Sequence, residues 1–473
     1  MTDILQRVDT DPSPEVDAAD ARRAPRRPDP TSRWTDRETG WARLDHLASP
    51  LVGLTSRLFA QLHDVDDIRM SGVGAQACDS RWLLGAACNE LNGGGAADPR
   101  QARAAAIGET VERYSGAYID TTTLRRATSA QLDAEGVDHV RPEEFTPFAP
   151  EQFTVEGFAY SPFTASTSLA WLRGVDLAVG SPLEVPAQLM FLANTALDDN
   201  RIGYSTSNGM ACGCTWEEAV LSGLLEVVER DAFMATWYGR HSLPLIDPDS
   251  SASLREFMAR HVEPTGLAVS LVDLSRLVDV PVVLALVRNP HNDVAPLALG
   301  AACSTSALTA ARKAMIEAFQ TRTWSKAEQR EGAVIDPGAG FEQVADFDDH
   351  VRLSLHPKSI AAAAFLDASS ERVGLEDLPA VPDASPGGAI DEIARRLRDQ
   401  GVRCAACDLT SPDVREAGLV VAKVIAPALS ALDSGYAGRM LGGRRLYERA
   451  FEVGLSPRKL TFDDLNPWPH PFP

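Results

Sequence analysis

The stretch from residue 207 to residue 231 organises this chain, because it joins a turn of small residues to a long apolar helix. It reads Ser207-Asn208-Gly209-Met210-Ala211-Cys212-Gly213-Cys214-Thr215-Trp216-Glu217-Glu218-Ala219 and continues through Glu226-Val227-Val228-Glu229-Arg230-Asp231. Thr215 and Glu218 have the spacing of a capping box, which predicts a helix that begins directly after Thr215. Apolar residues then recur at helical spacing as far as Phe233, so one face of this helix is expected to be buried.

Three carboxylates of this helix fall on one side of it. At about 100° per residue, Glu218, Glu226 and Glu229 lie within roughly 80° of one another, at the border of the apolar face. Clustered and partly buried carboxylates require a cation or strong hydrogen-bond donors. A divalent metal ion is the natural partner, and Mg²⁺ usually binds together with a phosphate.

The E-x-x-E-R motif of residues 226–230 occurs a second time, as Glu109-Thr-Val-Glu112-Arg113. A third helix carries the variant Glu317-Ala-Phe-Gln320-Thr-Arg322. Residues three apart share a helix face, so three helices are each expected to direct a carboxylate and a second polar side chain at one metal–triphosphate. For a single E-x-x-E-R the simpler interpretation is a surface salt bridge, but its repetition in apolar helices favours a binding site.

Helix and strand signals alternate along the chain and predict a mixed α+β fold. Asp98-Pro99 and Ser306 have the character of helix starts, and an amphipathic pattern predicts a helix over residues 389–400. The glycines at 93–95 predict a turn. Apolar runs predict strands at residues 267–272, 280–287, 402–409 and 419–425.

Composition divides the chain into a tail and one large domain. Residues 1–45 are rich in Asp, Pro, Arg and Ala and predict a disordered or loosely held N-terminal tail. Residues 46–473 are expected to form a single catalytic domain that ends in a proline-rich tail, residues 467–473. Alternating prolines favour an extended conformation, and the interleaved Trp468 and Phe472 favour a docked rather than a free tail.

Charge and hydropathy exclude several classes of protein. The net charge of −21 argues against nonspecific nucleic-acid binding. The sequence contains no apolar run of about 18 residues and no signal-peptide pattern, so we expect a cytoplasmic protein without a membrane span. Walker, H-E-x-x-H and G-x-S-x-G motifs are also missing from the sequence.

The seven cysteines do not predict a disulfide framework. Two close pairs, Cys212-Gly-Cys214 and Cys404-Ala-Ala-Cys407, leave a four-thiolate zinc site as an alternative. The favoured interpretation is that Cys404 and Cys407 lie in a buried strand, because free cysteine is a common core residue.

Four segments together resemble the YcaO family, over roughly residues 60–473: Gly108–Tyr114, Ser207–Asp231, Glu317–Arg322, and Val424–Pro427 leading to Leu441-Gly442. The resemblance implies a YcaO-type fold in which ATP and Mg²⁺ lie among glutamate-bearing helices without a Walker motif. By position it implies four metal and phosphate ligands, Glu109, Glu112, Glu226 and Glu229. It implies five further nucleotide contacts: Arg113, Glu218, Arg230, Gln320 and Arg322.

The Pro-x-Pro-x-Pro ending resembles the azoline-forming cyclodehydratases of this family. These enzymes convert Cys, Ser or Thr of a ribosomally synthesised precursor peptide to thiazoline or oxazoline, with phosphorylation of the amide oxygen. Arg322 is then expected to stabilise the transferring phosphoryl group, and the carboxylate of Pro473 to orient the reacting groups or accept a proton. The alternatives are a YcaO enzyme that forms a thioamide or an amidine, and an inactive scaffold that binds a peptide.

The resemblance also predicts partners. We expect a precursor peptide, a separate leader-binding ThiF-like protein, a flavin-dependent dehydrogenase and a homodimer. The separate ThiF-like protein is expected because no such domain is fused at the N-terminus of the sequence. In one departure from the family pattern, Cys214 stands where relatives usually have Asn.

Overall fold

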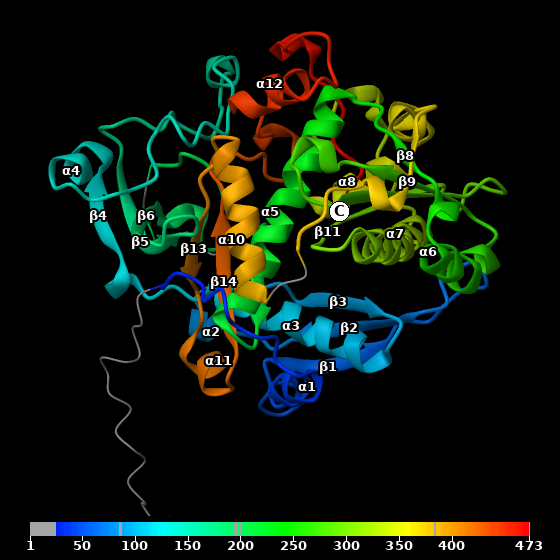
Figure 1. The fold of residues 1–473 in the computed structure, drawn as a ribbon, viewed down its shortest axis with the longest axis horizontal. Coiled ribbons are helices and arrows are strands. Elements are labelled where there is room, and N and C mark those ends of the chain that lie inside the picture. Colours follow the sequence, from blue (N-terminus) through cyan, green and yellow to red (C-terminus); the bar gives the residue numbers. More distant parts are fainter. Residues whose placement is uncertain (1–24, 85–87, 193–196, 198–199, 383–384, 473) are drawn as a thin grey trace, which may run out of the picture.

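The computed structural model describes residues 25–84, 88–192, 197, 200–382 and 385–472 (Figure 1). The helices are α1 (Arg37–Asp45), α2 (Arg81–Leu84), α3 (Pro99–Ala117), α4 (Ser129–Ala134), α5 (Trp216–Gly239), α6 (Ala252–Phe257), α7 (Ala307–Arg330), α8 (Phe347–Ser354), α9 (Pro357–Ala362), α10 (Pro386–Asp399), α11 (Pro412–Glu416) and α12 (Arg444–Glu452). The strands are β1 (Thr55–Ala60), β2 (Ser71–Ala77), β3 (Leu91–Ala96), β4 (Arg125–Thr128), β5 (Ser168–Asp176), β6 (Pro182–Pro186), β7 (Met210–Gly213), β8 (Leu245–Ile246), β9 (Ala268–Asp273), β10 (Val282–Arg288), β11 (Leu297–Cys303), β12 (Arg372–Val373), β13 (Ala405–Asp408) and β14 (Val420–Ile425). The predicted mixed α+β class is confirmed.

The described strands form three sheets. Their orders are β1-β2-β3, then β4-β5-β13-β14-β7 with β6 paired to β5, and β11-β10-β9-β8-β12. Helix α3 packs on the first sheet, α5 on β14 and β7, and α7 on β11 and β10 (Figure 1). Each of the three sheets therefore has one long helix packed against it.

Helix α5 is the central element, and its start follows the predicted signal only in part. The Thr215 side chain accepts a hydrogen bond from the backbone N–H of Glu218, as a helix N-cap does. The Glu218 carboxylate does not return to Thr215, however, and accepts instead from the N–H of Cys214. Most residues of α5 are buried, which is typical of a helix enclosed by other elements on several sides.

The turn before β7 lies directly against α5, and two glycines permit that approach. Gly209 has φ +77°, and a Cβ there would lie 2.2 Å from the carbonyl oxygen of Val424. On the helix, a Cβ at Gly223 would lie 2.3 Å from the carbonyl oxygen of Gly209. The turn and the helix therefore touch through their backbones, which brings the N–H of Gly209 within reach of a side chain on α5.

The glycines at 93–95 do not form the predicted turn. They lie inside strand β3, which pairs antiparallel with β2 through partners such as Gly94 with Val73. Cross-strand pairing overrides the weak strand preference of glycine here. The absence of side chains lets α3 pack closely, since a Cβ at Gly94 would lie 2.4 Å from the carbonyl oxygen of Ala102.

Residues 25–45 differ from the expectation of a loosely held tail. The Trp216 indole donates to the carbonyl oxygen of Arg26, and the backbone N–H of Thr35 donates to the Glu218 carboxylate. Helix α1 follows and contacts α3. Residues 1–24 lie outside the described residues, and the domain division at residue 45 stays a prediction.

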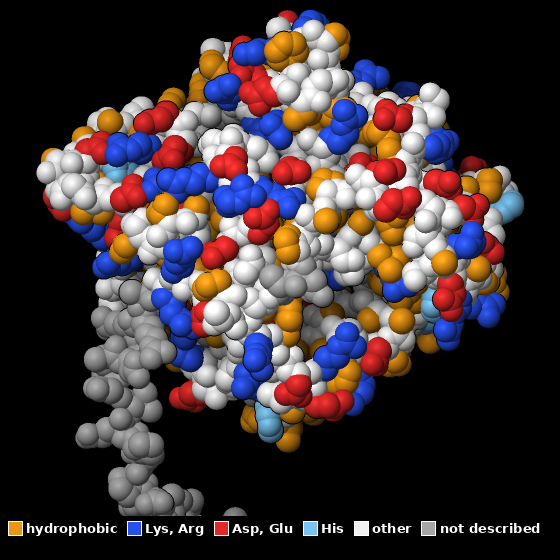
Figure 2. Space-filling model, in the orientation of Figure 1, with side chains coloured by type: hydrophobic (Ala, Val, Ile, Leu, Met, Phe, Trp, Pro, Cys, Tyr) orange, Lys and Arg blue, Asp and Glu red, His pale blue; other side chains and the backbone are white. Residues whose placement is uncertain are grey.

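The surface shows no concentration of basic side chains on the face drawn in Figure 2. Lys and Arg are interspersed there with Asp and Glu, and a recess opens between α7 and the layer of β1–β3. Within the described part of the chain, no helix has both the length and the apolar character that a membrane span requires.

Candidate functional site

Three strand–helix units present glutamates in the same way. Glu109 of α3 accepts a hydrogen bond from the N–H of Gly93 at 2.8 Å, and Glu226 of α5 accepts from Gly209 at 3.0 Å. Glu317 of α7 accepts from Ala301 at 3.0 Å. In each case one carboxylate oxygen reaches back 16 or 17 residues to the strand or turn before its helix. One oxygen of each carboxylate is thereby fixed, and the other is left to face neighbouring side chains.

Two arginines pair with these carboxylates in two neighbouring groups, and the charge of Glu226 acts on both arginines. Arg113 contacts Glu112 at 2.6 Å and Glu109 at 3.2 Å. Arg230 lies 3.5 Å from both Glu226 and Glu229 and 3.9 Å from Glu317, so it connects α5 to α7. The seven side chains are between 11% and 34% exposed. We call this set the glutamate–arginine site: Glu109, Glu112, Arg113, Glu226, Glu229, Arg230 and Glu317.

The site holds more negative charge than its arginines neutralise. Burial raises the pKa of Glu229 to about 8, and the charges of Glu317 and Glu226 add to the rise. Burial also raises the pKa of Glu317 to about 7 and raises that of Glu112 well above its usual value. Carboxylates with such pKa values favour a proton or a cation close by.

The chemistry of these donors fits Mg²⁺ and phosphate. Carboxylate oxygens are the ligands that Mg²⁺ prefers, and the ion usually retains contacts to substrate phosphates. Within the described residues, the Nε atoms of Arg113 and Arg230 and the Nη1 atom of Arg230 are buried without a hydrogen-bond partner. A guanidinium binds phosphate oxygens well, so these unused donors match a triphosphate beside the metal.

Comparison with known proteins agrees with this chemistry. Residues 93–430 match the family model described as YcaO cyclodehydratase, ATP- and Mg²⁺-binding. The chain belongs to the YcaO family. The predicted cofactors, ATP and Mg²⁺, are confirmed by that match, and the proteins of similar fold described next agree with it.

One relative and two solved structures show how far the likeness extends. An uncharacterised protein of Methanothermobacter thermautotrophicus is 27% identical over 335 residues, which are 70% of this chain and 79% of the relative. The structure of a heterocyclase in complex with substrate and cofactor has a TM-score of 0.74 at 22% identity, and the match covers 95% of this chain and 59% of the heterocyclase. The YcaO of Methanopyrus kandleri bound with AMPPCP and Mg²⁺ has a TM-score of 0.56 at 20% identity, with coverage of 83% and 91%. The YcaO-type fold is thereby confirmed, and this chain spans little more than half the length of the heterocyclase.

Glu218 lies apart from the glutamate–arginine site of this YcaO protein. It stands eight residues before Glu226 on α5, or about 12 Å along the helix axis at 1.5 Å per residue. Both of its oxygens accept backbone hydrogen bonds, one from Cys214 at 3.0 Å and one from Thr35 at 2.5 Å. In this structure Glu218 therefore holds the turn and the N-terminal segment together, and its role as a nucleotide contact stays a prediction.

Gln320 and Arg322 occupy different sides of α7. A Cβ at Gly95 of β3 would lie 2.7 Å from the amide nitrogen of Gln320, so this side chain packs against β3. Arg322 is fully buried and pairs with Asp66 and Asp67. The assignment of Arg322 to the phosphoryl group is therefore not supported by its position, because the helix turns it away from the site.

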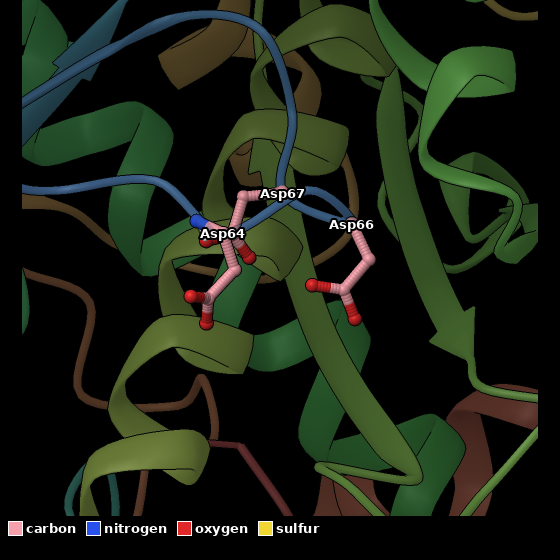
Figure 3. A group of neighbouring side chains, drawn as sticks. All are labelled: Asp64, Asp66 and Asp67. Carbon is pink, nitrogen blue, oxygen red and sulfur yellow. Dashed lines mark hydrogen bonds between the residues drawn. The ribbon is translucent and has the colours of Figure 1, made fainter.

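The aspartates that hold Arg322 form a second charged group on the loop between β1 and β2 (Figure 3). Oxygens of Asp64, Asp66 and Asp67 lie within 4.8 Å of one another, as metal ligands do. Lys326 donates to all three carboxylates, at distances from 2.6 to 3.1 Å. Since protein cations already neutralise this aspartate group, it lacks the unsatisfied charge of a metal site.

The ligands assigned from the sequence left out two residues of the site. Glu317 was expected to direct its carboxylate at the metal–triphosphate but was not among the four assigned ligands, although it has the same back-bond as Glu109 and Glu226. Lys423 of β14 was not considered, yet it is buried beside Glu226 and Glu112, and burial lowers its pKa to about 7. A lysine in the apolar run of residues 419–425 was the available signal.

The described part of the C-terminal tail docks beside the site. The Trp237 indole of α5 donates to the carbonyl oxygen of Trp468, and the Arg230 guanidinium lies 4.6 Å from the centre of the Phe472 ring. Phe472 is completely buried and packs against Phe233. Pro473 lies outside the described residues, so its predicted catalytic role stays a prediction.

The cysteines are free in the described structure, and Cys404 and Cys407 are buried as the favoured interpretation predicted. The aspartate group is the one set of three close potential metal ligands among the described residues. The alternative of a four-thiolate zinc site is therefore not supported.

Proposed function

We propose that this chain is an ATP-dependent cyclodehydratase that forms azolines in a precursor peptide. The observation that carries the proposal is the docking of Phe472 over Arg230, which places the proline-rich tail beside the glutamate–arginine site. Membership of a family described as YcaO cyclodehydratases supports the reaction class. The heterocyclase of similar fold was solved in complex with substrate and cofactor, which supports a heterocycle-forming reaction on a bound substrate.

The proposed reaction closes a ring by removal of an amide oxygen. The thiol or hydroxyl of Cys, Ser or Thr attacks the carbonyl carbon of the preceding residue, and the proton of that thiol or hydroxyl leaves with a base. Mg²⁺-ATP supplies the γ-phosphoryl group that makes the amide oxygen a good leaving group. Loss of the amide N–H proton and departure of phosphate give the azoline, so the peptide loses one water and ATP becomes ADP and phosphate.

Residues of the chain have distinct parts in this proposal. Among Glu109, Glu112, Glu226, Glu229 and Glu317, the carboxylates that bind Mg²⁺ would share it with the phosphates of ATP, and they must be deprotonated to do so. Arg113 and Arg230 orient the phosphates and stabilise charge that develops on the transferring group. No Ser–His pair is needed, because the substrate supplies the nucleophile.

Partner proteins belong to the same proposal. A separate leader-binding protein of the ThiF type is proposed to deliver the precursor, as the resemblance to the azoline-forming cyclodehydratases implies. A flavin-dependent dehydrogenase would oxidise azolines to azoles, and a homodimer is the proposed assembly.

The test is a reaction of the purified chain with a candidate precursor, the leader-binding protein, ATP and Mg²⁺. Mass spectrometry should show the loss of one water per ring, with release of phosphate. Incorporation of sulfur or nitrogen in place of oxygen would instead identify a thioamide- or amidine-forming enzyme. Absence of nucleotide binding would favour the inactive scaffold.

A further inference from the structure

A cavity of about 90 Å³ opens beside the glutamate–arginine site, between α5, the end of β14 and the segment after it, and the segments that precede β5 and β7. Its walls are mainly apolar and include Phe145, Leu189, Val424, Leu429 and Met440. Small residues such as Ala428, Ala431 and Gly442 form part of the lining, so a ligand backbone can approach them closely.

The polar end of the cavity is shared with the glutamate–arginine site. Arg230 lines the cavity and is also ion-paired with Glu226, Glu229 and Glu317. A group that contacts Arg230 from inside the cavity therefore lies next to the place where the phosphates are proposed to bind. This adjacency is what a reacting amide requires.

The groups at this end of the cavity are hydrogen-bond donors. Asn208 Nδ2 and Arg230 Nε are buried and have no partner within the described residues. Lys423 is 3% exposed and donates to Ser205 Oγ and the carbonyl oxygen of Thr206, each at 2.6 Å. These two bonds use two of its N–H donors, and its charge also lies close to Glu226 and Glu112 outside the lining. These donors fit an acceptor, and a peptide carbonyl oxygen is the acceptor that the proposed reaction brings.

We propose that this cavity holds the reacting segment of the peptide, with the side chain before the cyclised residue against the apolar wall. The inference rests on the proposed function. It adds where the peptide binds and which side chain the enzyme prefers before the cyclised residue. The reacting carbonyl belongs to the residue before Cys, Ser or Thr, so the side chain nearest to Arg230 is the one on that residue. An apolar side chain is favoured there, because an acidic one is desolvated by apolar neighbours and a basic one meets Arg230 and Lys423.

Direct binding is tested by photo-crosslinking with acetyl-photoleucine-Ser-Gly-amide in the presence of Mg²⁺-ATP. Mass spectrometry should place the label on cavity residues such as Leu189, Leu429 or Met440. The Ala428→Trp variant fills the cavity and should lose most of this label while it still binds Mg²⁺-ATP. A label that lies elsewhere, or that is unchanged in Ala428→Trp, overturns the inference.

Selectivity is tested with peptides that carry Leu, Glu or Arg before the cyclised residue. The parent protein should prefer Leu in kcat/KM by at least about tenfold, the scale of discrimination by a hydrophobic pocket. Ala428→Asp places a carboxylate in the cavity and should shift the Arg-to-Leu ratio towards Arg by a similar factor. The matched control is Ala252→Asp, at an exposed position at the start of α6 where an acidic residue is tolerated, and it should leave the ratio unchanged.

The two experiments separate this inference from the proposed function. If the label lies in the cavity but no peptide loses water, the azoline activity fails and the peptide site stands. If peptides are cyclised with equal efficiency for Leu, Glu and Arg, and Ala428→Asp changes nothing, the proposed function stands and the cavity assignment fails.

Discussion

The glutamate–arginine site and the aspartate group around Arg322 contain the same kinds of residue but are balanced differently. In the aspartate group, Arg322 and Lys326 hold the pKa of Asp66 down to about 2 against the effect of burial. In the glutamate–arginine site, burial and mutual repulsion raise the pKa of Glu229 to about 8. One group is internally neutralised and stabilises the fold, whereas the other keeps an excess of negative charge that a metal ion would neutralise.

The two groups also differ in how many of their N–H donors have hydrogen-bond partners. Lys326 has hydrogen bonds to three carboxylates, whereas two buried nitrogen atoms of Arg230 have no hydrogen-bond partner in the described residues, although one of them lies 3.5 Å from Glu229. A buried polar group without a partner is costly. Incomplete pairing of its buried charges therefore distinguishes the glutamate–arginine site, as a candidate binding site, from the aspartate group.

The largest expected effect is on stability, from Arg322→Met. Removal of this fully buried arginine leaves Asp66 and Asp67 without one of their cations. Breaking a buried pair in this way should lower the free energy of unfolding by about 3–5 kcal/mol, measured by urea denaturation. The matched control is Arg330→Met, because Arg330 pairs with Asp64 at an exposed position and should contribute about 0–1 kcal/mol. A stable Arg322→Met protein with lost ATP turnover would contradict the structural role.

The next effect is on chemistry, from Glu226→Gln or Glu229→Gln. Either change removes a ligand charge from the site while it preserves the shape of the side chain. Mg²⁺-dependent ATP turnover should fall by about 10²–10³-fold, the scale of a lost electrostatic contact, with folding retained by circular dichroism. Asp66→Asn is the contrasting variant, since it should lower stability and leave turnover near that of the parent. Parental turnover in both Gln variants would eliminate the metal site.

A smaller effect is expected from Phe472→Leu, which keeps an apolar side chain over Arg230 but removes the aromatic ring. Loss of a cation–π contact of about 0.5–2 kcal/mol should slow azoline formation by a factor of about 2–30, with Mg²⁺-ATP binding unchanged. Phe451→Leu on exposed α12 is the control and should have no effect. Equal rates in Phe472→Leu and the parent would show that the tail does not position Arg230.

The tail should also respond to acid. His350 and His470 are buried and stacked 4.0 Å apart, and each donates to a carbonyl oxygen, that of His470 and that of Asp433. Burial lowers the pKa of His350 to about 4 and that of His470 well below its usual value. Both imidazoles are therefore neutral while the tail is docked. They bind protons more readily once the tail is released.

These lowered pKa values mean that acid weakens the docking of the tail. Docking is fully stable above the ordinary imidazole pKa of about 6.5 and is weakened as the pH falls towards 4. Asp433 opposes this trend, because burial raises its pKa to about 6 and its contribution is lost as the pH rises. Since the two histidines outweigh one aspartate, the tail is expected to open on acidification. The charged side chains with an influence on the pair are Arg230, Asp346 and Asp349.

Hydrogen exchange of residues 466–472 at pH 7 and pH 5, corrected for the intrinsic rate, measures this opening. His350→Gln retains an N–H donor for the carbonyl oxygen of His470 but does not titrate, so it should reduce the pH dependence. An equal response in His350→Gln and the parent would assign the effect to other groups.

Local signals in the sequence predicted much of the fold. Asp98, Thr215 and Ser306 each cap a long helix in the structure, and the predicted strands at residues 267–272, 280–287 and 419–425 are β9, β10 and β14 within one or two residues at most ends. Caps and periodicity act over a few residues, so they can be read without knowledge of the rest of the chain.

The sequence already indicated that Arg322 and Glu317 lie on different sides of their helix. At about 100° per residue, Arg322 lies roughly 140° around α7 from Glu317, whereas Gln320 lies about 60° from it. The motif similarity alone therefore did not show that Arg322 faces the side of α7 away from Glu317. Lys423 was likewise visible as a lysine in an apolar strand, but its neighbours were not.

By itself, the sequence determined the family, the long helices and the carboxylates that α3 and α5 carry. Only the tertiary structure decided that Glu317 completes their site, that Glu218 binds backbone instead, and that Arg322 pairs with an aspartate 256 positions away in sequence. The physical reason is the separation in sequence over which each kind of interaction acts. A cap or a helix face depends on neighbours within one or two turns, whereas the partner of a buried charge depends on which distant segments the three sheets bring together.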